Sequence, residues 1–293
     1  MNKENVLIID DKNILETFNL EDIFECGQCF RWNNVNDSNL EYEGIFKDNI
    51  INIKQEKDKI IIKGIFNKEE VEEYFDINRD YSKLKKELSK KDKYLADAIK
   101  YGSGIRILNQ DLFEMIISFI ISANNNIPRI KKIINNLSQK CGKEIKYNGK
   151  TFYSFPTIDE LIKLDLKELR ETGLGFRDKY IYNTVRKIKN NEVNLNREFL
   201  DNLNTIDVKK ELSKLDGVGP KVADCILLFS DLKRFDSFPI DVWVRRVMND
   251  LYIKNPDEKK VKKEEIEALA EEKFGDYKGL AQQYLFYWKR ETN

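Results

Sequence analysis

A turn built from two glycines and a proline constrains the fold of this chain more than any other stretch. The segment Leu215-Asp216-Gly217-Val218-Gly219-Pro220 lies between two runs of helical periodicity. Asp207 suits the start of the first helix. Gly217 can adopt the positive φ that ends it, and Pro220 suits the first turn of the next helix, where no N–H is needed. The sequence therefore predicts two helices joined by a tight hairpin.

The hairpin turn has the properties of a phosphate-binding surface. Backbone N–H groups at the start of the second helix are free, and the two glycines place no side chains over them. An ordinary helix–turn–helix with a solvated lysine is the simplest interpretation of Gly-x-Gly alone. The longer pattern is more specific, because Lys221 follows in the first helical turn and Pro239-x-Asp241 follows the second helix.

Lys221 and Asp241 together suit the cleavage of an N-glycosidic bond. A free lysine has a pKa of about 10.4. If Lys221 acts as an amine nucleophile, we expect desolvation, cationic neighbours or the positive end of its helix to lower that pKa. Asp241 would stabilise positive charge that develops on a sugar, or move a proton, as carboxylates do in glycoside hydrolysis.

The composition excludes several other chemistries. The chain contains no histidine, which removes Ser-His and Cys-His nucleophile pairs and His-ligated zinc. Its four cysteines include Cys26-Gly-Gln-Cys29, but no second pair completes a metal site, and two incidental thiols are the simpler interpretation. Few cysteines, no signal peptide and no apolar run long enough to cross a bilayer favour a cytoplasmic protein without membrane contact.

Length and charge set broader limits. A chain of 293 residues suits two or three packed units. Lysine and arginine together number 51, and aspartate and glutamate together also number 51. This balance argues against a non-specific coat for nucleic acid, but not against a local phosphate-binding face.

Residues 1–104 are predicted to form a small β-rich domain. Turn-forming residues separate short β-prone runs, which suggests an antiparallel sheet with one wet face. Two helical stretches then follow. The expected strands and helices are Phe30–Trp32, Leu40–Phe46, Ile50–Lys54, Ile60–Ile65, Lys68–Phe75 and Tyr81–Leu88.

Residues 105–293 are predicted to be helical almost throughout, which gives an α+β fold with a larger all-α domain. Asp111 is placed to cap one helix. Thr157-x-x-Glu160 and Asp165-x-x-Glu168 are capping signals for two more, the first of them a capping box. Besides the hairpin, the expected helices include Asp111–Ser122, Ile127–Cys141, Arg177–Lys189, Arg197–Leu203, Asp241–Tyr252, Lys262–Phe274 and Tyr277–Arg290.

Several separated motifs resemble one known family in the same order along the chain. The hairpin with its lysine and the Pro-x-Asp turn is similar to the helix–hairpin–helix DNA glycosylase superfamily, and more narrowly to its 8-oxoguanine DNA glycosylase/AP lyase family. The resemblance covers almost the whole chain. Its further motifs are Gly27-Gln28-x-Phe30-Arg31-Trp32, Asn124-Asn125-Asn126-Ile127-x-Arg129-Ile130, Gly173-Leu174-Gly175-Phe176-Arg177 and Ala281-Gln282-x-x-Leu285-Phe286.

The resemblance implies a role for each motif residue in base excision. Lys221 would be the Schiff-base nucleophile, and Asp241 would assist glycosidic cleavage. The damaged base would flip out of the duplex and stack between Phe286 and the Cys225 side. The remaining pocket residues are Phe229 along the wall, Gln282 at the Watson–Crick edge, and Gly27, whose carbonyl would accept the N7–H that 8-oxoguanine has and guanine lacks.

The resemblance also implies a DNA-binding surface. Asn124, Arg129 and Arg177 would contact the orphaned cytosine, and Phe176, where relatives often carry tyrosine, would wedge into the gap. Trp243 stands where relatives often carry histidine near phosphate, so that contact is either lost or taken over by the indole N–H. Other expected DNA contacts are Asn125, Arg170 and the backbone around Gly217, Gly219 and Val222.

Each of these residues has a simpler structural interpretation. Cys225 suits a small apolar core position as well as a pocket wall. Aromatic residues at helical positions, such as Phe229 and Phe286, are usually core. Arg129, Arg170 and Arg177 would be solvated charges without the surrounding motifs. For Lys221 and Asp241 the functional interpretation is clearly ahead.

Two rival functions fit parts of the same pattern. A monofunctional alkylated-base glycosylase of this superfamily needs the aspartate but not the amine of Lys221. A non-enzymatic hairpin module would grip DNA backbone but leaves Lys221 and Asp241 unexplained. The iron–sulfur branch is disfavoured because no cysteine follows Cys225.

We expect the partner to be double-stranded DNA that contains 8-oxoguanine. We also expect a monomer that needs no cofactor, with a possible structural cation on the hairpin carbonyls. In a bacterium it would associate with the nucleoid.

Overall fold

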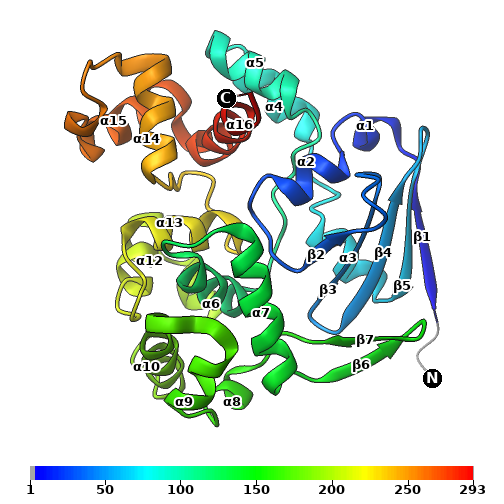
Figure 1. The fold of residues 1–293 in the computed structure, drawn as a ribbon. Helices are drawn as coiled ribbons and strands as arrows, with labels where there is room; N and C mark the ends of the chain where they lie inside the picture. The colour runs from blue at the N-terminus through cyan, green and yellow to red at the C-terminus, as the bar shows by residue number, and fades with distance from the viewer. Residues whose placement is uncertain (1–3, 293) are drawn as a thin grey trace.

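The computed structural model describes residues 4–292 and has an antiparallel sheet followed by a helical region (Figure 1). This confirms the predicted α+β class. The described residues form one five-stranded sheet in the order β1-β5-β4-β3-β2. Its strands are β1 Asn5–Ile9, β2 Trp32–Asn34, β3 Glu41–Phe46, β4 Asn49–Gln55 and β5 Ile60–Ile65.

Buried and outward-pointing side chains alternate along the strands, so one face of the sheet is buried. Ile51 and Ile53 of β4 are fully buried, as are Ile60 and Ile62 of β5, whereas Lys63 points outward. In β1 the outward side chains are the exposed Val6 and Ile8. The sequence interpretation missed β1, and it placed the second strand two residues early.

The described range contains sixteen α-helices; most match predicted ones, but Lys12–Leu15, Leu20–Glu25 and Lys93–Tyr101 were not predicted. Asp111, Thr157 and Asp165 cap helices as predicted, and the pair Asp165 and Glu168 also forms a full capping box. The helices are α1 Lys12–Leu15, α2 Leu20–Glu25, α3 Lys68–Tyr74, α4 Tyr81–Ser89, α5 Lys93–Tyr101, α6 Leu112–Ser122, α7 Ile127–Cys141, α8 Ile158–Leu161, α9 Leu166–Leu169, α10 Asp178–Lys189, α11 Arg197–Asp201, α12 Thr205–Leu212, α13 Pro220–Phe229, α14 Val242–Met248, α15 Lys263–Phe274 and α16 Lys278–Thr292. Within residues 4–292, none of these helices has the length and apolar character that a bilayer crossing requires.

Two sequence-based predictions about this region are wrong. The first is the all-helical character after residue 104, because β6 Glu144–Tyr147 and β7 Lys150–Tyr153 form a hairpin. Its turn is Asn148-Gly149, with positive φ at both residues, which is a strong hairpin signal. The second concerns α12, which begins at Thr205 with Asn204 as its cap, so Asp207 lies inside the first turn.

Two hydrophobic cores divide the molecule. One lies between the sheet, α2 and α3, and the other fills the helical region. Helices α4 and α5 belong to the second core, and α5 packs against α16 near the C-terminus (Figure 1). The proposed domain boundary after residue 104 therefore leaves two helices of the first domain in the core of the second.

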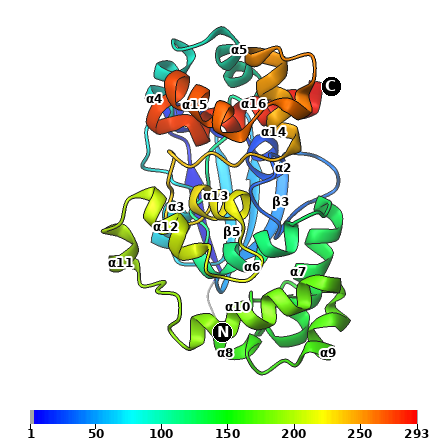
Figure 2. The ribbon, with the colours of Figure 1, turned by 90° about the vertical axis from the view of Figure 1, so that its left-hand side faces the viewer.

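Helix α13 lies near the middle of the helical region (Figure 2). It packs against α6 and α12, and the chain then passes through an extended link to α14. Because α14 packs against α16, the segment after α13 meets the end of the chain. This arrangement brings the hairpin, the Pro-x-Asp turn and the C-terminal helix into one region.

Candidate active site

The hairpin turn between α12 and α13 requires glycine at Gly217. Its φ is +82°, and a Cβ there would lie 3.1 Å from the side chain of Tyr180. At Gly219 a Cβ would meet no atom within 4 Å, so this side of the turn is open to a ligand. The start of α13 therefore presents its backbone N–H groups beside free space, as a phosphate-binding turn requires.

Helix α10 holds the hairpin turn in place. The Asp216 carboxylate pairs with Lys187 Nζ at 2.5 Å and accepts a hydrogen bond from Asn183 Nδ2 at 2.7 Å. Thr184 Oγ1 donates to the Asp216 carbonyl at 3.0 Å. Asp216 thus anchors the turn to α10.

Lys221 is the second residue of α13 and is partly buried. Its Nζ lies 5.9 Å from the ring centroid of Phe119 on α6. Cys225, one turn further along α13, and Asp241, at the start of α14, both act electrostatically on this amine. The fold therefore brings together the amine and the carboxylate that the sequence interpretation paired.

The α14 helix fixes the orientation of Asp241. As the N-cap, its Oδ1 accepts a hydrogen bond from the Val244 N–H at 2.8 Å. The preceding residues Phe238 and Ile240 are buried and anchor the link. The positive end of α14 favours a negative charge at this position.

The electrostatics of Lys221 differ from the sequence-based expectation. Cys225 and, to a smaller extent, Asp241 raise the pKa of Lys221, although burial acts in the opposite direction. Burial raises the pKa of the Cys225 thiol, so Cys225 acts on the amine only at high pH, and at neutral pH the charge that favours the protonated amine is that of Asp241. The predicted lowering of the Lys221 pKa is wrong for the protein alone. The amine is held in its charged form and must lose a proton before it can attack.

Helix α16 supplies one wall of a narrow pocket with a free hydrogen-bond acceptor. Gln282 and Phe286 line it together with Phe238, Val244 and Met248, and in the protein alone it has no room for a water molecule. Gln282 is 5% exposed, and its Oε1 is buried without a hydrogen-bond partner among residues 4–292. An unsatisfied buried polar atom costs about 1–3 kcal/mol, which suggests that a ligand completes it.

Two further residues predicted to line the base pocket are almost completely buried. Cys225 is 3% exposed and Phe229 is 4% exposed. The Phe229 ring stacks on Phe119, with centroids 5.7 Å apart and planes 20° apart. The Phe119 ring thus lies near both the Lys221 amine and the Phe229 ring, which no sequence motif predicted.

The loop at Gly27 reaches this pocket from the N-terminal region. Gly27 has a φ of +88°, and a Cβ there would lie 3.9 Å from Phe286 Cε1. The next side chain, Gln28, is fully buried. It donates to the carbonyls of Ile23 at 2.9 Å and Arg106 at 2.8 Å, and accepts from the Leu108 N–H at 2.9 Å. The loop is therefore fastened to the core next to Gly27.

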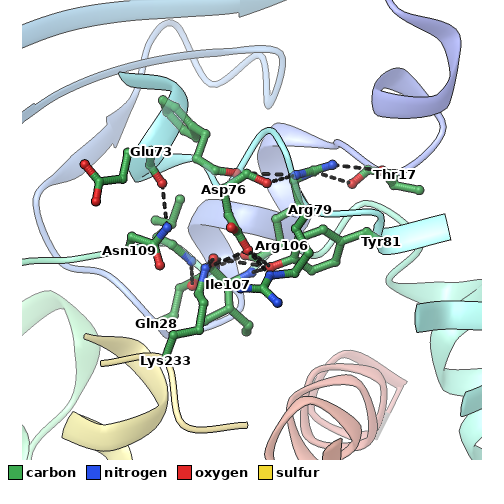
Figure 3. A network of polar contacts seen from close by, with 12 residues as sticks. Thr17, Gln28, Glu73, Asp76, Arg79, Tyr81, Arg106, Ile107, Asn109 and Lys233 are labelled. Carbon is green, nitrogen blue, oxygen red and sulfur yellow. Dashed lines mark hydrogen bonds and ion pairs between the residues drawn. The ribbon is translucent and has the colours of Figure 1, made fainter. Parts of the chain in front are cut away.

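A buried polar network continues from this loop to the segment after α13 (Figure 3). Lys233 Nζ pairs with Asp76 at 2.8 Å and donates to the Ile107 carbonyl at 2.6 Å. Burial lowers the pKa of Lys233 to about 8. Nearby, Gln110 Nε2 donates to the carbonyls of Gln28 at 2.8 Å and Phe229 at 3.0 Å. The network joins the Gly27 loop to the end of the helix that carries Lys221.

A second group of predicted residues gathers where α6, α7 and α10 meet. Arg177 is buried and donates from Nε to the Ala123 carbonyl at 3.0 Å and from Nη2 to the Asn124 carbonyl at 2.9 Å. Burial, and then the charge of the exposed Arg129, lower the pKa of Arg177. Phe176 is 59% exposed and projects from the same turn. Arg129 and Phe176 are thus exposed, whereas the guanidinium of Arg177 is buried and bonded to backbone carbonyls.

The other predicted DNA contacts have varied surroundings. Asn125 donates to the Ile121 carbonyl at 3.1 Å, and Arg170 pairs with Asp178. Trp243 is 44% exposed beside Arg246, and Val222 is buried while its backbone lies in the first turn of α13. Within the described chain, no three Cys, Asp or Glu side chains cluster as metal ligands.

Two family models together match most of the chain. One describes the 8-oxoguanine DNA glycosylase N-terminal domain and matches residues 12–116. The other describes the HhH-GPD superfamily base excision DNA repair proteins and matches residues 117–274. The N-terminal model thus includes the Gly27 loop, and the second includes the hairpin, Lys221 and Asp241.

Known proteins match over nearly the full chain. The N-glycosylase/DNA lyase of Saccharomyces cerevisiae is 31% identical over 91% of this chain and 82% of its own length. The N-glycosylase/DNA lyase OGG1 of Arabidopsis thaliana is 29% identical over 90% of this chain and 75% of its own. The Clostridium acetobutylicum 8-oxoguanine glycosylase/lyase, solved with double-stranded DNA containing cytosine opposite 8-oxoguanine, is 46% identical, covers 98% of both chains and superposes with a TM-score of 0.88.

Proposed function

The chain belongs to the 8-oxoguanine DNA glycosylase/lyase family of the helix–hairpin–helix base-excision repair superfamily, and we propose that it excises 8-oxoguanine through Lys221 and then cleaves the DNA strand. The observation that carries the residue assignment is the placement of a partly buried amine at the start of α13 near the capping carboxylate of α14. The enzyme is a bifunctional DNA glycosylase/lyase.

DNA would bind first at the hairpin and around Phe176, Arg129 and Arg177. The free N–H groups at the start of α13 would hold a phosphate of the damaged strand. Phe176 would fill the space that the flipped nucleotide leaves, and Arg129 and Arg177 would bind the acceptor atoms of the orphaned cytosine. The exposed Arg129 supports this assignment, and Arg177 would have to exchange its bonds to the Ala123 and Asn124 carbonyls for bonds to the base.

The pocket beside α16 would then open and receive the flipped base. Phe286 would stack on one face of the base and Cys225 would lie on the other. The unpaired Oε1 of Gln282 would accept a hydrogen bond from the Watson–Crick edge. The Gly27 carbonyl would accept N7–H, a donor that guanine does not have. This contact would favour the lesion over the normal base.

Lys221 and Asp241 would carry out base release. After proton loss, Lys221 Nζ attacks C1′ while the bond from C1′ to the base breaks, and the base leaves with a proton. Asp241 stabilises the positive charge that develops on the sugar ring. Opening of the ring gives a Schiff base between Lys221 and C1′, loss of a C2′ proton expels the 3′ phosphate, and water finally frees the amine.

The raised pKa of Lys221 gives Asp241 a second role. A charged lysine cannot attack, so its proton must move when DNA enters the site. The flipped sugar would separate the amine from Asp241 and exclude water, and both changes disfavour the charged amine. We infer that substrate binding itself converts Lys221 into a nucleophile.

The reaction needs an amine and a carboxylate, so we propose that the protein acts as a monomer without a cofactor. A structural cation on the hairpin carbonyls stays a prediction. The test is incision of duplexes that carry 8-oxoguanine opposite each of the four bases, with analysis of the strand ends. The proposal expects lesion-dependent incision with a β-elimination end. Base release that leaves an intact abasic strand would instead indicate a monofunctional glycosylase.

A further inference from the structure

Helix α16 carries a second glutamine that acts on the Gly27 loop. Gln283 follows the pocket residue Gln282 and is 2% exposed. Its Nε2 donates a hydrogen bond to the Cys26 carbonyl at 2.6 Å. Cys26 immediately precedes Gly27 in the chain, although 257 positions separate it from Gln283. The C-terminal helix thus holds the peptide that leads into Gly27.

Arg290 extends the same contact two turns further along α16. Its Nη2 donates to the Glu25 carbonyl. Its Nη1 lies 3.5 Å from the position of a Cβ on Gly27, and its guanidinium carbon lies 5.5 Å from the ring centroid of Phe286. Residues seven positions apart share one face of a helix. One face of α16 therefore holds the carbonyls of two successive residues, Glu25 and Cys26.

The residue after Gly27 is fixed as well. The side chain of Gln28 is bonded to the core, and its carbonyl accepts a hydrogen bond from Gln110 at 2.8 Å. Gly27 lies between these anchored neighbours, and in residues 4–292 its own carbonyl accepts no hydrogen bond. Because glycine loses more backbone freedom on folding than any other residue, a defined carbonyl direction at Gly27 depends on these neighbours.

We propose that Gln283 and Arg290 are positioning residues for lesion recognition. They hold the Gly27 carbonyl at the pocket edge where it meets the N7–H of 8-oxoguanine. This proposal rests on the function assigned to Gly27 above. Both positioning residues lie on α16, as do Gln282 and Phe286. The same helix therefore fixes the position of the Gly27 loop relative to the residues that would contact the Watson–Crick edge and the face of the base.

The experiment compares two reactions of the full-length protein. Gln283→Met keeps a similar volume but cannot donate a hydrogen bond. Single-turnover excision of 8-oxoguanine should fall by about tenfold to a hundredfold, as expected for small misplacements of a reading group. Cleavage of a preformed abasic site needs no base reading and should stay within about twofold. Unchanged excision, or an equal loss in both reactions, would overturn the proposal.

A matched control lies on the same helix. Lys289 is partly buried, and its Nζ lies 4.9 Å from the Trp288 ring centroid rather than at the Gly27 loop. Lys289→Met should leave the ratio of the two reactions unchanged. A change in that ratio as large as that of Gln283→Met would also overturn the proposal, because the effect would then belong to α16 in general.

A second substrate separates the role of Gln283 and Arg290 from recognition of the lesion by the Gly27 carbonyl. In 7-deaza-8-oxoguanine a carbon replaces N7, so the lesion offers no donor to Gly27. The unmodified protein should excise it more slowly than 8-oxoguanine, and Gln283→Met should reduce this difference. Equal excision of both lesions by the unmodified protein would overturn the reading by Gly27. If Gln283→Met still discriminates fully between the two lesions, the positioning role of Gln283 would be overturned, but recognition by the Gly27 carbonyl would not.

Arg290 gives an independent variant if Gln283→Met does not fold. Its side chain is 23% exposed, so truncation is better tolerated there than at the buried Gln283. Arg290→Met should slow lesion excision by about threefold to tenfold, the range of one net hydrogen bond, with abasic-site cleavage preserved. If Arg290→Met excises the lesion and cleaves abasic sites as fast as the unmodified protein, the positioning role of Arg290 would be contradicted.

Discussion

One oxygen of the Asp178 carboxylate pairs with two nitrogens of Arg170: Oδ2 lies 2.7 Å from both Nε and Nη2 of the guanidinium. Asp178 is fully buried, and its Oδ1 also accepts the Lys179 N–H. The pair closes the segment 170–178, whose middle carries Phe176 and Arg177. It therefore fixes the turn that we assign to the orphaned cytosine.

Removal of this charge should affect opposite-base selection. Asp178→Asn keeps the shape but weakens the pair, and we expect a loss of about 1–3 kcal/mol in stability. The preference for cytosine opposite 8-oxoguanine should fall severalfold, because Phe176 and Arg177 lose their anchor. Excision rates with each opposite base measure this. If the folded variant keeps its preference for cytosine, the pair of Arg170 and Asp178 has no role in selecting the opposite base.

Asp241→Asn should slow base excision by a large factor. The amide keeps its shape but cannot stabilise positive charge on the sugar, and positioned acid–base groups contribute about 10²–10⁴-fold. Because the Asp241 charge also raises the pKa of Lys221, that pKa should fall in the variant. Single-turnover excision tests the first effect, and NMR titration of the labelled lysine tests the second. Unchanged excision would assign the role to another acid.

Gly27→Ala should impair lesion excision more than binding to undamaged DNA. The nearest atoms to an added Cβ are 3.5 and 3.9 Å away, so space is available. The φ of +88° is the obstacle, since a left-handed conformation costs a residue with a side chain about 1–2 kcal/mol. The backbone should shift and redirect the carbonyl. Normal excision by Gly27→Ala, measured beside DNA affinity, would exclude the carbonyl as the reader.

Glu114 should make stability depend on pH. Burial raises its pKa to about 7, although Arg31 at 3.7 Å acts in the opposite direction. The unfolded chain releases this proton near 4.5, so between these pH values the folded protein binds more protons and loses stability as pH rises. Glu114→Gln should remove this loss, which amounts to at most about 3 kcal/mol. Melting curves that stay parallel for both proteins from pH 5 to 8 would contradict it.

Local sequence signals predicted the parts of the site that lie close together in the chain. The hairpin, Lys221 and the capping position of Asp241 follow from turn and helix chemistry within short segments. The β6–β7 hairpin was also predictable, because Asn148-Gly149 is a strong turn signal that the helical interpretation overlooked. Asn204, the cap of α12, could not be distinguished from Asp207 by residue type, because both side chains carry an oxygen that accepts from a backbone N–H.

Contacts between distant segments could not be predicted in this way. Nothing near Gln283 or Gln110 indicates that they bond the Gly27 loop and the end of α13. The pKa of Lys221 depends on Asp241, twenty positions later, and on how deeply α13 is buried. Such effects arise from tertiary packing, which a single sequence does not encode in any local pattern.

Borohydride trapping followed by peptide mass spectrometry tests the central assignment most directly. With a duplex that contains 8-oxoguanine opposite cytosine, reduction of the Schiff base should attach the DNA to Lys221 alone. Lys221→Gln should form no adduct and release no base, while lesion binding survives. An adduct on another lysine, or efficient trapping by Lys221→Gln, would contradict the assignment of Lys221 as the nucleophile.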